Sequence, residues 1–125
     1  MTPEEQAAAE AVLASERAWA ATAVSSLEAE HAAIVEGVAH ANLDDEHDPE
    51  GATVGFERAR VASLLAAARR RLTLLDEAAE RLVAGTYGHC GRCGGHIAAE
   101  RLAAEPAAVM CVGCAAAPTS PLRRR

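Results

Sequence analysis

Two close pairs of cysteines near one end of the chain constrain its fold more than any other feature. The sequence reads Cys90-Gly-Arg-Cys93 and then, after seventeen further residues, Cys111-Val-Gly-Cys114. This is the C-x₂-C…C-x₂-C spacing with which four thiolates enclose one zinc ion in a tetrahedron. Each pair wraps one side of the ion, and neighbouring glycines give the backbone room to turn. We therefore predict a small unit that binds one structural Zn²⁺, with the ligands Cys90, Cys93, Cys111 and Cys114.

A site closed by four thiolates leaves no coordination position for an activated water molecule. Zinc in such a site stabilises the fold and does not catalyse hydrolysis, so the sequence favours a protein that is not an enzyme. The alternative is a thiol oxidoreductase with two redox-active pairs, but cysteine pairs in a reducing cytosol more often hold metal. His89 and His96 flank the first pair. We expect neither to be a ligand because four thiols already complete the site.

The rest of the chain has little material for a bulky core. Half of the 125 residues are hydrophobic, but about half of these are alanine, and the only aromatic side chains are Trp19, Phe56 and Tyr87. Alanine is the best helix former, so this composition suits long helices better than sheets. The chain shows neither a secretory signal nor an apolar run long enough to cross a bilayer. We expect a soluble, cytoplasmic protein.

The first forty residues have the pattern of one long helix. Pro3 and the two glutamates after it are typical of a helix start, and the predicted helix runs from residue 3 to about residue 41. Residues spaced by seven and by four place one stripe on its surface. The stripe comprises Leu13, Ala20, Val24, Leu27, His31, Ile34 and Val38. We expect His31 to be a polar residue at the edge of the seam and not a metal ligand.

A second helix follows after a polar break. Residues 42–51 contain Asn, Asp, Pro and Gly, which favour a turn. From about residue 53 to residue 84 the apolar spacing alternates between four and three. This stripe comprises Val61, Leu65, Ala68, Leu72, Leu75, Ala79 and Leu82. Neither helix is stable alone at this composition, so we predict that they pack as an antiparallel hairpin.

The predicted fold is therefore mainly α, with three parts. Residues 1–84 form a long antiparallel helical hairpin, or coiled coil, with an acidic tip at 42–52. Residues 85–116 form the small four-cysteine zinc finger. Residues 117–125 form a disordered basic tail that ends in three arginines.

The turn of the predicted hairpin carries an unusually dense group of carboxylates. They are Asp44, Asp45, Glu46, Asp48 and Glu50. A solvated turn is the simplest interpretation. A calcium loop is disfavoured because the regular ligand spacing and the glutamate at its twelfth position are missing.

Charge argues against general binding to nucleic acid. The formal net charge is −6, although three of the twelve basic residues are Arg123, Arg124 and Arg125. Affinity for nucleic acid comes largely from lysine and arginine that displace counterions from the phosphates. We expect no direct, sequence-specific binding to DNA.

The cysteine region also resembles a known family. The residues that carry the resemblance are Tyr87-Gly-His-Cys-Gly-Arg-Cys-Gly-Gly-His-Ile97, then Glu100-Arg-Leu102, Pro106 and Cys111-Val-Gly-Cys114. Over about 30 residues they resemble the zinc-finger signature of the DksA/TraR family of bacterial transcription regulators. The predicted hairpin with its acidic turn is similar to the coiled coil of that family.

The resemblance implies a protein that binds RNA polymerase and is not an enzyme. Members insert the coiled-coil tip through the secondary channel towards the catalytic Mg²⁺ and change the lifetime of promoter complexes. They often act together with the alarmone ppGpp, which is therefore a candidate ligand. The resemblance assigns the polymerase-facing tip to Asp44, Asp45, Asp48 and Glu50.

The tip departs from the pattern of the best-known members, which is Asp-x-x-Asp-x-Ala. Here the sequence is Asp48-Pro-Glu-Gly-Ala-Thr53, with Gly51 and Thr53 where the later Asp and Ala stand. Glu50 offers a carboxylate displaced by one position. The leading hypothesis is a regulator of initiation that acts in the secondary channel. The alternative is a zinc-ribbon module that binds nucleic acid through the finger and the arginine tail.

Overall fold

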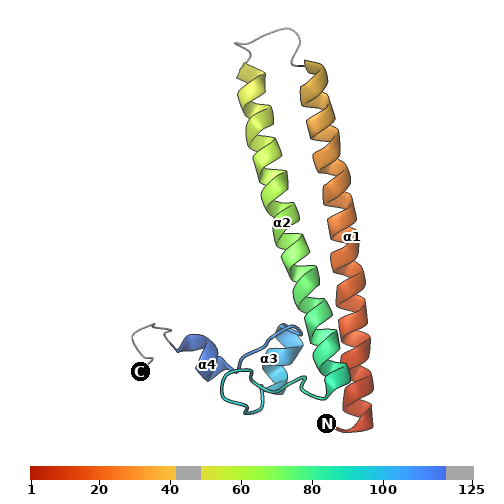
Figure 1. Ribbon diagram of the computed structural model, residues 1–125, viewed down its shortest axis with the longest axis vertical. Helices are drawn as coiled ribbons and strands as arrows, with labels where there is room; N and C mark the ends of the chain where they lie inside the picture. The colour runs from red at the N-terminus through yellow and green to blue at the C-terminus, as the bar shows by residue number, and fades with distance from the viewer. Residues whose placement is uncertain (42–48, 118–125) are drawn as a thin grey trace. The chain divides into compact units, whose positions relative to one another are not determined.

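The structure is a computed structural model that describes residues 1–41 and 49–117 and, within these, the side chains of 1–37 and 52–117. Four helices follow one another in the described part, which contains no named strand. They are α1 (Pro3–Ala41), α2 (Pro49–Ala84), α3 (Ala99–Ala104) and α4 (Val112–Ala116), and Figure 1 shows the two long helices side by side. The predicted mainly α fold with a long helical hairpin is confirmed.

The start of α1 is fixed by its first residues. The Thr2 hydroxyl accepts a hydrogen bond from the Glu5 backbone N–H at 3.0 Å, and the Glu5 carboxylate accepts one from the Thr2 N–H at 2.8 Å. This reciprocal capping box satisfies two backbone donors that a helix leaves without partners, and Pro3 occupies the first helical position. The predicted start near residue 3 is confirmed.

The start of α2 differs from the prediction. The helix begins at Pro49 and not near residue 53, so the last part of the predicted turn is helical. Proline suits the first position of a helix because it has no backbone N–H to satisfy, and Glu50 favours the positive end of the helix dipole. Pro49 and Gly51 disfavour the interior of a helix, but both are tolerated in its first turn.

The chain divides into two compact units. The hairpin unit comprises residues 16–73, and the finger unit comprises residues 1–15 together with the residues from 74 onwards. The described part of the finger unit therefore contains the start of α1, the end of α2, and both short helices. The predicted tail lies outside the described residues from 118 onwards.

In the hairpin unit, α1 and α2 run antiparallel. Ion pairs across the seam show the direction, because Arg71 contacts Glu16 at 3.2 Å whereas Arg60 contacts Glu30 at 3.8 Å. The predicted stripes face the seam: Ala20, Val61 and Leu65 are buried. Val24, Leu27, His31, Ile34, Ala68 and Leu72 are half-buried. Val38 lies outside the described side chains.

In the finger unit, the start of α1 and the end of α2 contribute a small apolar core. Its buried members are Leu13, Leu75, Ala78 and Leu82. Gly85 then ends α2 with a positive φ of 83°, and its N–H donates to the Leu82 carbonyl while the Thr86 N–H donates to the Arg81 carbonyl. This is a Schellman motif, which satisfies the last carbonyls of the helix and turns the chain towards the cysteines.

Candidate metal centre

The first cysteine pair lies in a tight loop. His89 and His96 form an isolated antiparallel bridge at its base. Within it the Cys90 N–H donates to the Gly95 carbonyl at 2.7 Å, and the Gly94 N–H donates to the Cys90 carbonyl at 2.9 Å. Gly94 has a φ of 77°, which side chains other than glycine rarely adopt. The loop thus brings Cys90 and Cys93 to one side of a common point.

The second pair lies at the start of α4. Cys111 is the N-cap residue, and its sulfur accepts a hydrogen bond from the Cys114 N–H at 3.4 Å. The Gly91 N–H donates to the Val109 carbonyl at 2.8 Å, which joins the first loop to the segment that leads into the second pair. Arg92 adds a hydrogen bond from its guanidinium to the Cys114 carbonyl at 3.3 Å.

The four sulfurs converge on one point. They all lie within 4.8 Å of one another, and the Cys93 and Cys111 sulfurs are 3.9 Å apart. A tetrahedral site with zinc–sulfur bonds of about 2.3 Å has sulfur–sulfur edges of roughly 3.8 Å. The donor set and its spacing therefore fit one zinc ion. In the described part of the chain, no histidine or carboxylate belongs to this cluster.

The electrostatics of the cluster also suit a cation. Hydrogen bonds from the backbone N–H groups of Cys93 and Cys111 lower the pKa of the Cys90 thiol to about 6. The neighbouring thiols of Cys111, Cys90 and Cys93 raise the pKa of Cys114 to about 12. Four thiolates at this distance repel one another, so a dication is needed before all four deprotonate. With four thiolate ligands, no position remains for a catalytic water.

Two hydrogen bonds hold the segment between the cysteine pairs. The Tyr87 hydroxyl donates to the Pro106 carbonyl at 2.8 Å in a buried position, and burial raises the pKa of this phenol. The Arg101 guanidinium donates to the Met110 carbonyl at 2.8 Å, one residue before Cys111. The sequence alone does not predict either of these two supports.

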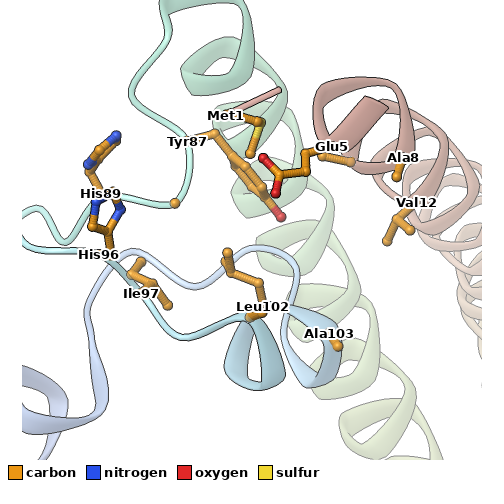
Figure 2. A pocket seen from close by; sticks show the side chains of 13 residues that line it. Met1, Glu5, Ala8, Val12, Tyr87, His89, His96, Ile97, Leu102 and Ala103 are labelled. Atoms are coloured by element: carbon orange, nitrogen blue, oxygen red, sulfur yellow. The ribbon is translucent and has the colours of Figure 1, made fainter. Parts of the chain in front are cut away.

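An apolar cavity of about 650 Å³ lies between the first turns of α1 and the finger, all within the finger unit. Small residues such as Ala8 and Ala103 leave this space open, and Figure 2 shows the Tyr87 ring, Leu102 and Ile97 around it. His89 and His96 stand at its edge with ring centroids 4.9 Å apart. No sequence pattern predicts this cavity, because it arises from packing between segments that are far apart in the chain.

The structure does not describe the side chains of the predicted tip residues. Asp44, Asp45 and Asp48 lie outside the described residues. Glu50 lies in the first turn of α2, but its side chain is also outside the described part. Their role stays a prediction.

Comparison with known proteins agrees with this geometry. Residues 85–119 match the family model described as the prokaryotic dksA/traR C4-type zinc finger. The finger belongs to the DksA/TraR family. This C4-type finger has its four cysteines positioned to bind one metal ion.

The likeness to DksA proteins extends beyond the finger. The chain is similar to the structure of transcription factor DksA2 from Pseudomonas aeruginosa, with 26% sequence identity and a TM-score of 0.75. The match covers 92% of this chain and 83% of that chain, so it includes the long helices as well as the DksA/TraR finger. None of the curated proteins matches the sequence. In the described residues, no helix is both long and apolar enough to span a membrane.

Proposed function

We propose that this protein is a DksA-type transcription regulator that binds RNA polymerase and inserts its acidic tip into the secondary channel to modulate initiation. The observation that carries the proposal is the fold similarity to a transcription factor over 92% of the chain, joined to a finger of the same family. The protein acts by binding and not as an enzyme, with the cytoplasm as its place of action.

The proposal gives the finger a structural role. Cys90, Cys93, Cys111 and Cys114 ligate one Zn²⁺, which holds together two loops that share few buried side chains. The metal contributes folding free energy, because the ligand set exists only when both loops are in place.

The tip supplies the active part in this proposal. Asp44, Asp45, Asp48 and Glu50 direct negative charge towards a channel that contains Mg²⁺ and basic groups. Charge complementarity of this kind speeds encounter and fixes orientation, whereas the net charge of −6 opposes contact with DNA phosphates. Glu50 belongs to the first turn of α2, and in the sequence it lies one position away from the second aspartate of the family's tip pattern.

The tip is tested with Asp48→Ala and Glu50→Ala in the full chain. We expect the wild type to bind RNA polymerase and to change the lifetime of promoter complexes, and each variant to lose most of that effect on lifetime. Glu80→Ala is the matched control, because Glu80 is an exposed carboxylate in the finger unit. Circular dichroism checks that all four proteins have the same helix content, and assays with and without ppGpp test whether it is a ligand.

Unchanged promoter-complex lifetimes in both tip variants contradict the role of the tip. A gel shift with nonspecific DNA tests the nucleic-acid alternative, which predicts binding that weakens steeply with salt. The arginines on which that alternative relies lie outside the described residues. The present proposal predicts no appreciable shift.

A further inference from the structure

Two of the three aromatic side chains lie outside the core. Trp19 on α1 is 80% exposed and Phe56 on α2 is 79% exposed, whereas Tyr87 is buried. A buried Trp or Phe removes about 150–250 Å² from water and dominates the energetics of cores and interfaces. A chain with so few bulky side chains thus leaves two of its three aromatic rings in solvent.

The ion pairs of the hairpin unit place these side chains on one face. Arg60 and Arg71 are eleven residues apart, about three helical turns, so they lie on the same side of α2. Both cross the seam to carboxylates of α1, Arg60 to Glu30 and Arg71 to Glu16. These two pairs therefore mark one face of the hairpin.

The exposed apolar residues neighbour these pairs. Phe56 and Leu64 lie four residues before and after Arg60, and Trp19 lies three residues after Glu16. Residues three or four apart share a side of a helix. Leu64 is 43% exposed. We call Trp19, Phe56 and Leu64 the aromatic face.

The opposite face of the hairpin is different. It is marked by the pair Arg69–Glu28 at 2.8 Å, since Arg69 lies about 160° around α2 from Arg71. The residues three or four positions away on that outer side are small or polar, namely Ser25, Ala32, Ala66 and Thr73. Trp19, Phe56 and Leu64, the most exposed large apolar side chains described in the hairpin unit, thus lie on one side, whereas Val35, which is 37% exposed, lies on the side of Glu28.

The size of the aromatic face limits what covers it. Its two rings and one leucine offer roughly 400–500 Å² of apolar surface. A stable interface buries about 800 Å² on each partner. The face is too small to hold a dimer of this chain by itself, but it has the size of an anchor within a larger interface.

The surrounding charges exclude a phosphate backbone as the occupant. Both arginines of the face, Arg60 and Arg71, already contact carboxylates of α1, and Arg60 also bonds Glu57 at 2.6 Å. Stacking of bases on aromatic rings works together with free cations that track the phosphates. Here the cations are engaged, which favours an apolar protein surface as the partner.

We propose that the aromatic face is a docking surface for RNA polymerase, with Trp19 and Phe56 inserting into apolar pockets of the enzyme. This inference rests on the proposed function and adds a contact separate from the acidic tip. Trp19 lies opposite about residue 68 by the register of the Arg71–Glu16 pair, so the two rings are roughly 18 Å apart along α2. One partner surface of at least that length contacts both.

The test measures the affinity of the full chain for RNA polymerase with Trp19→Ala, Phe56→Ala and Leu64→Ala. We expect each aromatic variant to bind at least tenfold more weakly and Leu64→Ala to bind a few-fold more weakly. The matched control is Val35→Ala, which truncates a side chain of α1 that is 37% exposed and lies on the side of Glu28. It should bind within twofold of the wild type.

Thermal unfolding of each variant separates binding from folding, because exposed side chains contribute little to stability. If the wild type binds RNA polymerase and both aromatic variants bind it with the same affinity, the docking surface is overturned and the proposed function stands. A wild type that does not bind polymerase overturns both. A wild-type dimer that Trp19→Ala converts to a monomer, with polymerase binding unchanged, shows that a second copy covers the face and also overturns the inference.

Discussion

The finger is stabilised by a few buried side chains and by single hydrogen bonds between distant residues. The buried side chains that the structure describes beyond Gly85 are few: Tyr87, Cys90, Ile97, Pro106, Ala107 and Ala108. The Tyr87 phenol joins the residue before the first loop to the Pro106 carbonyl, nineteen residues later. A buried carbonyl that loses its hydrogen-bond donor costs free energy, so this single bond matters for the stability of the finger.

Replacing Tyr87 with phenylalanine should lower the free energy of unfolding of the finger by about 1–3 kcal/mol, because the Pro106 carbonyl is left without its donor. Burial raises the pKa of the phenol in the folded state. The stabilisation is therefore complete below the ordinary tyrosine pKa and is lost as pH rises through the folded-state pKa. Thermal unfolding across alkaline pH, with zinc in excess, measures both effects.

Tyr87 is the only tyrosine, so ultraviolet absorbance of the phenolate follows this residue alone. Thr86→Val is the control for a neighbouring change, since the exposed Thr86 hydroxyl makes only a 3.4 Å contact with the Arg81 carbonyl. An unfolding free energy in Tyr87→Phe equal to that of the wild type would show that the hydrogen bond is not needed.

The residues that the sequence predicted best are those whose spacing fixes their geometry. The convergence of the four cysteines followed from two C-x₂-C motifs, because each motif folds locally into a loop. The partners of Tyr87 and Arg101 did not follow, since Pro106 and Met110 meet them only after the spacer between the pairs has folded. Local spacing predicts ligands, whereas their supports depend on tertiary packing.

At the scale of the helix, apolar residues of α2 spaced alternately by four and three positions are buried or half-buried, whereas most of their neighbours in the sequence are exposed. Leu64 and Leu65 are adjacent in sequence, yet Leu65 is 7% exposed and Leu64 is 43% exposed. The heptad-like stripes predicted this assignment correctly. The start of α2 was wrong by about four residues, because proline and glycine fit a first helical turn as well as a loop.

Leu65→Ala should lower the free energy of unfolding by about 2–4 kcal/mol, because it leaves a cavity in a narrow seam. Leu64→Ala should cost less than about 1 kcal/mol, since the side chain is partly in solvent already. Urea unfolding followed by circular dichroism compares the two.

The same substitution at neighbouring positions makes each variant the control for the other. Equal losses of stability at both positions would contradict the burial pattern, and with it the antiparallel register given by the ion pairs. Those pairs are at least partly exposed to solvent, which weakens the attraction between their charges, so they specify register more than they stabilise.

Across the whole molecule, helix content and metal binding are located in different segments. The two long helices have 39 and 36 residues, whereas α3 and α4 have 6 and 5. The sequence predicted this division into a hairpin and a finger from composition and cysteine spacing. In the structure, residues 1–15 instead belong to the same compact unit as the finger, which no local sequence pattern indicates. The domain boundaries that we predicted from the sequence stay predictions.

Removal of zinc with a chelator should unfold the finger and leave most of the helical circular dichroism, because the hairpin unit has its own seam. We expect one zinc ion per chain by elemental analysis. Cys111→Ser should lose nearly all of it at micromolar protein, because it removes one of four thiolates.

His96→Ala is the matched variant for Cys111→Ser, since His96 lies beside the first cysteine pair and outside the sulfur cluster. It should keep a full zinc ion. Collapse of the whole helical signal on chelation would show that the hairpin unit depends on the finger for its structure.

The finger unit joins two segments that are far apart in the sequence, and this affects the order in which its parts are synthesised. Leu13 is buried in a unit that joins residues 1–15 to residues at position 74 or later. During synthesis the first turns of α1 leave the ribosome long before the residues that cover them. The growing chain therefore carries an uncovered apolar stripe until α2 is complete. Cys114 emerges later still, so the set of four cysteines is complete only after both long helices have been synthesised.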